Sequence, residues 1–159
     1  MNTLMKSSLT AAAAVSLAAA PSPAQGKNPV IGTWVLNVAK STYNPGPGPT
    51  SGTRTYTMAG SMVKSVAEGV GADGKATKTE YTAAYDGKDY PTTGNANADM
   101  IALTRGDANT IDAVLEKAGK ETSRTHRVIS KDGKTMTLNS TGTDAKGAKT
   151  NNVVVYDKK

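Results

Sequence analysis

A catalytic site would have to be built from histidine, serine and acidic side chains, and this chain has a single histidine, His126. A serine nucleophile would need that histidine as its base. No Gly-x-Ser-x-Gly sequence accompanies it, and the nearby Ser123 and Ser130 lie in ordinary strand sequence. The sequence therefore gives no support to a Ser-His-Asp triad.

Acidic residues could in principle form a metal site or a carboxylate pair for glycoside hydrolysis. With one histidine and no cysteine, carboxylates would have to supply almost every metal ligand. The aspartates lie mainly in turns that lack the alternating acidic positions and closing glutamate of a calcium loop. Nothing marks a catalytic pair among Glu68, Glu80, Glu116 and Glu121. We therefore expect no enzyme activity, no metal and no cofactor.

Two arginines in segment 121–130 would point to opposite sides of a strand. Arg124 and His126 share one face, and Arg127 lies on the other. Whichever face points inward, one guanidinium enters or borders the interior, where it needs an anionic partner. Three outcomes remain open: a ligand carboxylate, a protein carboxylate such as Glu80, or an arginine that stays exposed.

The elements that must position these residues are short strands separated by turns of Asp, Gly and Lys. Asp-Gly supplies the positive φ angles of tight hairpins, so each such turn predicts a strand that folds back on the one before it. The four turns are 72–75, 86–89, 131–134 and 144–147. The runs predicted as strands are 30–38, 53–58, 62–70, 76–85, 88–93, 99–105, 110–116, 121–130, 135–142 and 150–156.

These runs predict an all-β fold, an antiparallel up-and-down meander that closes into a barrel of about 8–10 strands. From Val30 onward the chain has only 24 Leu, Ile, Val, Met and Trp residues, so we expect an interior that large side chains do not fill completely. Loop 39–50 is rich in proline from Asn44 to Pro49. It is either a lid over a cavity mouth or a stiff connector, and we favour the connector.

The N-terminal residues 1–24 are predicted to be a signal peptide that is cleaved after Ala24. They begin with a positive charge at Lys6 and continue with an apolar run over 9–20, which is too short to span a membrane. Residues 25–159 then form one cysteine-free domain, exported to the periplasm or the extracellular space. Without Lys6 it carries 18 basic and 13 acidic side chains, a net charge of +5. Because these charges are scattered rather than clustered, we expect no nucleic-acid partner.

The triplet Gly32-Thr33-Trp34 stands at the head of the first predicted strand and resembles the Gly-x-Trp motif of the lipocalins. The chain as a whole resembles small secreted bacterial proteins of lipocalin-like (calycin) type. In lipocalins the tryptophan closes the base of a barrel whose open end takes up small, mostly apolar ligands. The resemblance implies structural roles for Gly32 and Trp34. Lipocalins cover this tryptophan with an arginine after the last strand, where this chain has Lys158 and Lys159.

From this resemblance we expect a secreted barrel that binds or carries a small, partly apolar ligand such as a fatty acid. Its carboxylate would bind an inward-facing arginine, as it does inside fatty-acid-binding barrels. The candidate ligand-binding residues are Tyr81, Tyr85, Arg124 and His126. The alternative is a filled barrel that acts as a structural or protein-interaction module without a ligand.

Overall fold

A computed structural model describes residues 28–159, and the predicted signal peptide, 1–24, lies outside the described residues. The elements in chain order are β1 (Gly32–Leu36), η1 (Val38–Lys40), β2 (Ser51–Ala59), β3 (Met62–Val70), β4 (Ala76–Ala83), β5 (Asp86–Thr93), β6 (Met100–Arg105), β7 (Thr110–Lys117), β8 (Lys120–Ile129), β9 (Thr135–Thr143) and β10 (Lys149–Lys158). The element η1 is one turn of 3-10 helix. All other elements are strands.

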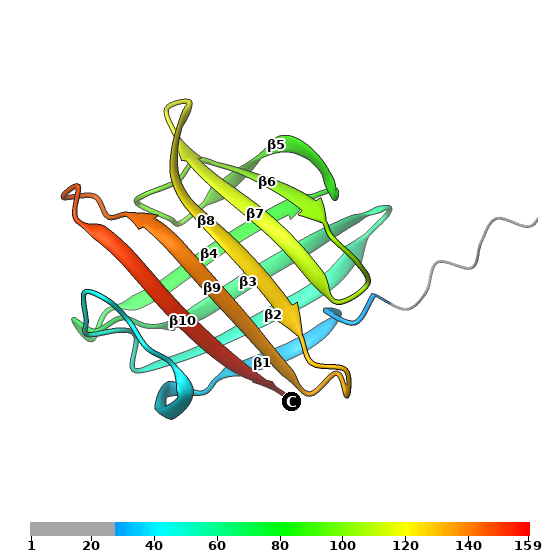
Figure 1. Ribbon diagram of the computed structural model, residues 1–159, viewed down its shortest axis with the longest axis horizontal. Helices are drawn as coiled ribbons and strands as arrows, with labels where there is room; N and C mark the ends of the chain where they lie inside the picture. The colour runs from blue at the N-terminus through cyan, green and yellow to red at the C-terminus, as the bar shows by residue number, and fades with distance from the viewer. Residues whose placement is uncertain (1–27) are drawn as a thin grey trace, which may run out of the picture.

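The strands form one closed antiparallel barrel (Figure 1). Each strand pairs with its neighbours in the sequence, and β1 closes the barrel by pairing with β10 through Trp34 to Leu36. The predicted all-β meander is thereby confirmed, with ten strands. Because a meander places successive connections at alternate ends, the β1–β2 loop, the β5–β6 loop and the β7–β8 turn share one end, which we call the mouth. We call the other end, where β1 begins and β10 ends, the base.

Three of the four Asp-Gly-Lys turns are hairpin turns held by the same contact. The carboxylates of Asp73, Asp132 and Asp144 each accept a hydrogen bond from the backbone N–H two residues later, at 2.8–3.1 Å. These aspartates therefore serve the turns themselves.

The fourth turn, 86–89, is not a hairpin. The chain reverses at residues 84–85, and Asp86 already belongs to β5. Gly87, with φ of 74°, lies where the register between β5 and β6 shifts. The positive φ angle that Asp-Gly provides thus forms a bulge inside a strand. Pro91 lies in the part of β5 that is not paired with β4, where a missing N–H is tolerated.

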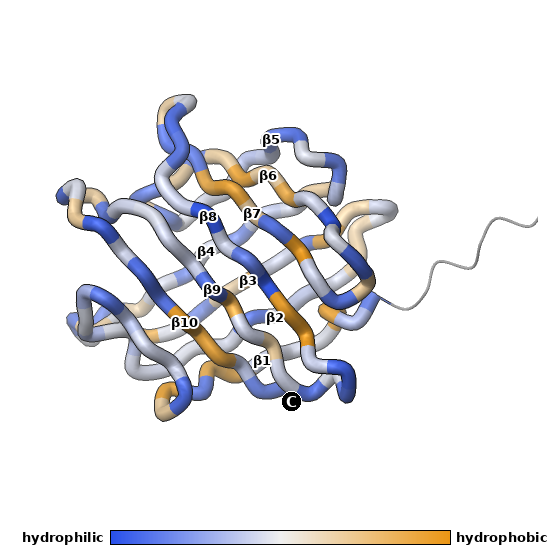
Figure 2. Tube along the Cα trace, in the orientation of Figure 1, coloured by the Kyte–Doolittle hydropathy of each residue, from blue (hydrophilic) through white to orange (hydrophobic). Residues whose placement is uncertain are grey.

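Alternation along the strands sends apolar side chains inward, where the buried ones pack into one core cluster. Figure 2 shows short hydrophobic stretches in β7, β8 and β10, separated by polar ones. The largest fully buried side chains are those of Trp34, Tyr56, Leu103 and Met136. Tyrosine and arginine side chains also point into the barrel.

The base of the barrel is closed by Trp34, which has no solvent exposure. Its indole Nε1 donates a 2.7 Å hydrogen bond to the carbonyl of Val30. The ammonium of Lys158 lies 4.9 Å from the centre of the indole ring and donates to the carbonyl of Pro29. Gly32 is required beside this contact, since it has φ of 129° and a Cβ there would lie 3.1 Å from Lys158 Cε. Lys158 therefore covers the tryptophan where lipocalins use an arginine.

Candidate functional site

The barrel encloses a cavity of about 290 Å³ that extends toward the mouth. This volume is just below the range of roughly 300–1,000 Å³ that is usual for small-ligand sites. Tyr43 and Pro49 of the β1–β2 loop and Asn95 of the β5–β6 loop line it at the mouth. The proline-rich loop thus borders the cavity as a lid would. It is fixed to β10, because Thr42 exchanges two backbone hydrogen bonds with Val153, of 2.7 and 2.9 Å.

The polar part of the cavity comes from strands on two sides of the barrel. Period-two alternation points Arg54 and Tyr56 inward from β2, Tyr156 inward from β10 and Tyr81 inward from β4. Arg127 enters from β8, which lies in the front wall in Figure 1, whereas β2 lies in the rear wall. The two guanidinium groups therefore approach the same tyrosine, Tyr56, from different strands.

Tyr56 is the centre of this cluster. Its phenol oxygen accepts a 3.5 Å hydrogen bond from Arg54 Nη1, and the guanidinium carbon of Arg127 lies 5.1 Å from the centre of its ring. The guanidinium of Arg54 also lies 5.8 Å from the ring centre of Tyr156. These distances correspond to cation–π contacts.

Neither arginine has a carboxylate partner within residues 28–159. Arg127 is only 5% exposed and Arg54 is partly buried, yet no ion pair of the described residues includes either one. The Nε atoms of both are buried and have no hydrogen-bond acceptor in this part of the chain. Among the described residues, the side chains that line the cavity include no aspartate or glutamate. A buried guanidinium normally has such a partner, so this cavity has an excess of positive charge.

The tyrosines influence the ionisation of this cluster. Burial alone would lower the pKa of Arg54, but the phenols of Tyr56, Tyr156 and Tyr81 raise it, so Arg54 stays protonated. The pKa of Arg127 is raised in the same way: burial would lower it, but the phenols of Tyr56 and Tyr81 raise it by more. For Tyr56, burial favours the neutral phenol, but the charges of Arg54 and Arg127 more than offset it and lower the pKa to about 8. At pH 7 the cluster therefore carries two positive charges.

The rest of the cavity wall is largely apolar. Most of it comes from β6 and β7, through Ile101, Leu103, Ile111, Ala113 and Leu115. The hydroxyls of Thr125 on β8 and Ser140 on β9 also line the cavity and bond to each other at 2.7 Å. The cavity can thus hold a molecule with an apolar body and an anionic end.

The structure places only one of the predicted binding residues in this cavity. Tyr81 lines it, and burial followed by the neighbouring Tyr56 raises the pKa of its phenol. Arg124 lies on the outer surface, where it forms a two-pronged ion pair with Glu121 with both distances at 2.6 Å. His126 is also on the outside, with its Nδ1 2.7 Å from Asp112.

Arg124 and His126, both predicted as ligand-binding residues, therefore do not line this cavity: of the two faces left open for β8, the inward one is that of Arg127. Of the three outcomes open for an inward arginine, the internal ion pair with Glu80 is not formed. The residues that the sequence reasoning missed are Arg54, Tyr56 and Tyr156. A signal for the first two was present in the alternating sequence Arg54-Thr55-Tyr56, which places both on one face of a strand.

Tyr85 lies instead in an open hollow of about 990 Å³ at the base. Its ring stacks on the guanidinium of Arg105 at 4.2 Å, and its hydroxyl accepts a hydrogen bond from Asn28. The lysines of this hollow, Lys134 and Lys158, are exposed, so water can solvate them. These lysines therefore do not require a bound anion in the way that the buried arginines do.

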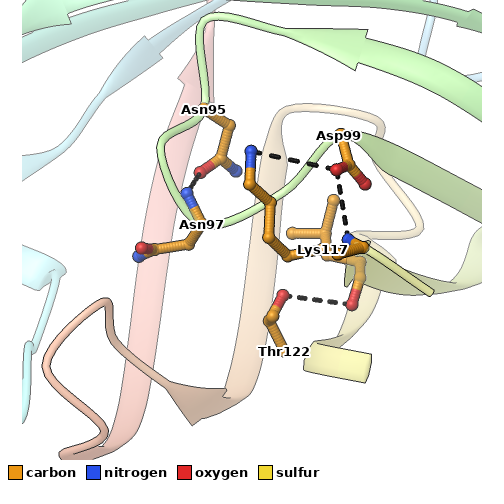
Figure 3. Close-up of polar contacts among 7 residues, drawn as sticks. Asn95, Asn97, Asp99, Lys117 and Thr122 are labelled. Carbon is orange, nitrogen blue, oxygen red and sulfur yellow. Dashed lines mark hydrogen bonds and ion pairs between the residues drawn. The ribbon is translucent and has the colours of Figure 1, made fainter. Parts of the chain in front are cut away.

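The rim of the mouth is held by polar contacts between two connections (Figure 3). The carboxylate of Asp99 accepts a hydrogen bond from the backbone N–H of Ala118 at 3.1 Å and lies 3.8 Å from the ammonium of Lys117. Asn95 accepts a 2.9 Å hydrogen bond from the backbone N–H of Asn97. The β5–β6 loop, which carries the cavity residue Asn95, is thus tied to the β7–β8 turn.

Residues 28–159 offer neither a cluster of metal-ligating side chains nor a membrane-spanning helix. No group of three or more His, Cys, Asp or Glu side chains in this part of the chain could hold a metal ion. No helix in the same residues is long and apolar enough to cross a membrane.

Comparison of the chain with protein-family models and with curated proteins finds no match.

Proposed function

We propose that this protein is an exported, lipocalin-like barrel that binds a small, partly apolar anion in its interior. The observation that carries the proposal is the pair Arg54 and Arg127. Among residues 28–159, their buried Nε atoms have no acceptor, and the cavity that they face has no carboxylate in its lining. Burying an uncompensated charge is strongly unfavourable. A ligand anion would supply the missing partner, and the wall of β6 and β7 would hold its apolar part.

The predicted signal peptide and the Gly32-Thr33-Trp34 motif support export and the lipocalin-like assignment. The closed base, with Trp34 under Lys158, leaves the mouth as the way in. The carboxylate of a fatty-acid-like molecule is the simplest anionic end that fits this proposal.

One observation favours the second candidate, a structural barrel without a ligand. Tyr56 has a pKa of about 8, so its phenolate could serve as an internal counter-ion for the arginines. At neutral pH the phenol is mostly uncharged, however, and one phenolate cannot balance two guanidinium groups. We therefore favour the ligand-binding barrel.

Titration with 8-anilinonaphthalene-1-sulfonate, a fluorescent apolar anion, tests the proposal. Saturable binding should be lost in Arg127→Met and unchanged in Arg124→Met, a matched control because Arg124 is on the same strand but outside the barrel. Circular dichroism verifies the fold of both variants, and Arg127→Lys, which keeps the charge, should retain part of the binding. Absence of saturable binding, or equal binding by wild type and folded Arg127→Met, would contradict the proposal.

A further inference from the structure

We infer that the anionic end of the ligand is a phosphate monoester. This inference rests on the proposed function and concerns the group that Arg54 and Arg127 would bind. The two guanidinium groups carry two positive charges without a counter-ion among the described residues. Both guanidinium groups line one cavity and approach the same tyrosine, and the described side chains of the cavity include no carboxylate.

A carboxylate carries one negative charge, so it would leave one of the two guanidinium charges without a counter-ion. A phosphate monoester has a second pKa of about 6 and carries close to two negative charges at neutral pH. Its charge equals that of Arg54 and Arg127 together. The match matters more inside a barrel than on a surface, because charges interact more strongly where water is excluded.

The donors fit as well as the charge. Each guanidinium presents a planar fork of N–H groups that matches phosphate oxygens in pairs. The buried Nε atoms of Arg54 and Arg127 are donors without an acceptor among residues 28–159, and they come from different strands. A phosphate monoester offers three terminal oxygens to the two forks, whereas a carboxylate has only two oxygens to divide between them.

The apolar part of the ligand is limited by the cavity. A volume of about 290 Å³, lined on β6 and β7 by Ile101, Leu103, Ile111 and Leu115, suits one short hydrocarbon chain. A phospholipid with two acyl chains would exceed it. The inferred class is therefore a single-chain alkyl or isoprenyl phosphate.

Calorimetric titration of the purified protein with four probes separates the possibilities. The probes are octyl phosphate, octyl sulfate, octanoate and inorganic phosphate, all kept monomeric in solution. Octyl sulfate has the same three terminal oxygens as the phosphate but only one charge. At pH 7.5 octyl phosphate should bind about tenfold more tightly, or better, than octyl sulfate or octanoate, because its second negative charge gives the second guanidinium a counter-ion and hydrogen bonds between charged groups contribute at least that factor.

Two further measurements tie the preference to its cause. Between pH 7.5 and 5 the advantage of octyl phosphate over octyl sulfate should shrink, because the phosphate gains a proton near pH 6. In Arg54→Gln the affinity for octyl phosphate should exceed that for octyl sulfate by less than about threefold, while octanoate still binds. The exposed control Arg124→Gln should keep the wild-type preference.

The outcomes distinguish the two proposals. Octanoate binding as tightly as octyl phosphate would overturn the phosphate inference and leave the proposed function intact. Binding of none of the three octyl compounds would overturn both. Inorganic phosphate binding as tightly as octyl phosphate would overturn the inferred single-chain ligand, since the apolar wall would then contribute nothing.

Discussion

Tyr56 should titrate inside the barrel near pH 8, and Tyr56→Phe should remove that titration. The phenol oxygen is 3.5 Å from Arg54 Nη1, and the guanidinium carbon of Arg127 is 5.1 Å from the ring centre. Burial opposes ionisation of the phenol, but the two positive charges outweigh it and lower the pKa from 10.0 to about 8. Because this pKa is lower in the folded than in the unfolded chain, ionisation of Tyr56 stabilises the fold.

The sign and size of the effect follow from the two pKa values. The contribution is absent about a unit or more below pH 8, grows between pH 8 and 10 and is complete about a unit above pH 10. Two pH units correspond to about 3 kcal/mol in the free energy of unfolding. Tyr81, whose pKa is raised by burial and by Tyr56, opposes this trend only above pH 10.

Urea unfolding of wild type and Tyr56→Phe at pH 7, 8, 9 and 10 measures the effect. The difference in unfolding free energy should widen by about 2 kcal/mol from pH 8 to 10, because Tyr56 is already half ionised at pH 8 in the folded chain and only half ionised at pH 10 in the unfolded chain. Phenolate absorbance should rise over the same range. Tyr90→Phe is the control, because hydrogen bonding to Asp86 raises the pKa of Tyr90. A difference that stays constant, or a phenolate that forms only above pH 10, would refute the placement of two protonated guanidinium groups around Tyr56.

Three further predictions concern stability. Without ligand, Arg127→Met should leave the free energy of unfolding unchanged or raise it by about 1–4 kcal/mol, because an apolar side chain replaces a buried charge that has no ionic partner among the described residues. The exposed control Arg124→Met should change the free energy of unfolding by less than about 1 kcal/mol. Trp34→Ala should lower it by about 3–5 kcal/mol, measured by urea unfolding, since the indole fills the base. Gly142→Ala should lower the melting temperature more than Gly133→Ala. A Cβ at Gly142 would overlap the backbone of β8, whereas at Gly133 the Cβ meets open space and only the φ of 70° opposes it.

The strands could be predicted because their signals are local. Alternating side chains and Asp-Gly turns lie within a few residues of each other, and the predicted run 62–70 coincides with β3. The bulge at Gly87 was predicted as a turn because both structures use the same positive φ angle. Only the pairing of β5 with β6, between residues distant in the sequence, distinguishes them.

The orientation of β8 could not be predicted from its own residues. One face carries Arg124 and His126 and the other carries Thr125 and Arg127, so both are polar and neither is marked as the inner one. The choice is made by the neighbouring strands, where Ile111 of β7 and Leu138 of β9 are the register partners of Arg127 and line the same cavity. Tertiary packing, rather than local pattern, therefore determined which arginine became a candidate binding residue.

The charge balance of the interior connects the empty barrel with the proposed ligand complex. At pH 7 two guanidinium charges face a cavity that, among residues 28–159, has no carboxylate in its lining. Above pH 8 the phenolate of Tyr56 supplies one negative charge from within, and a bound anion must then compete with it for Arg54 and Arg127. The stability of the empty barrel should therefore rise with pH while its affinity for octyl sulfate falls, and both changes should disappear in Tyr56→Phe. A structural barrel without a ligand predicts the first change alone, so measuring the two together separates the candidate functions.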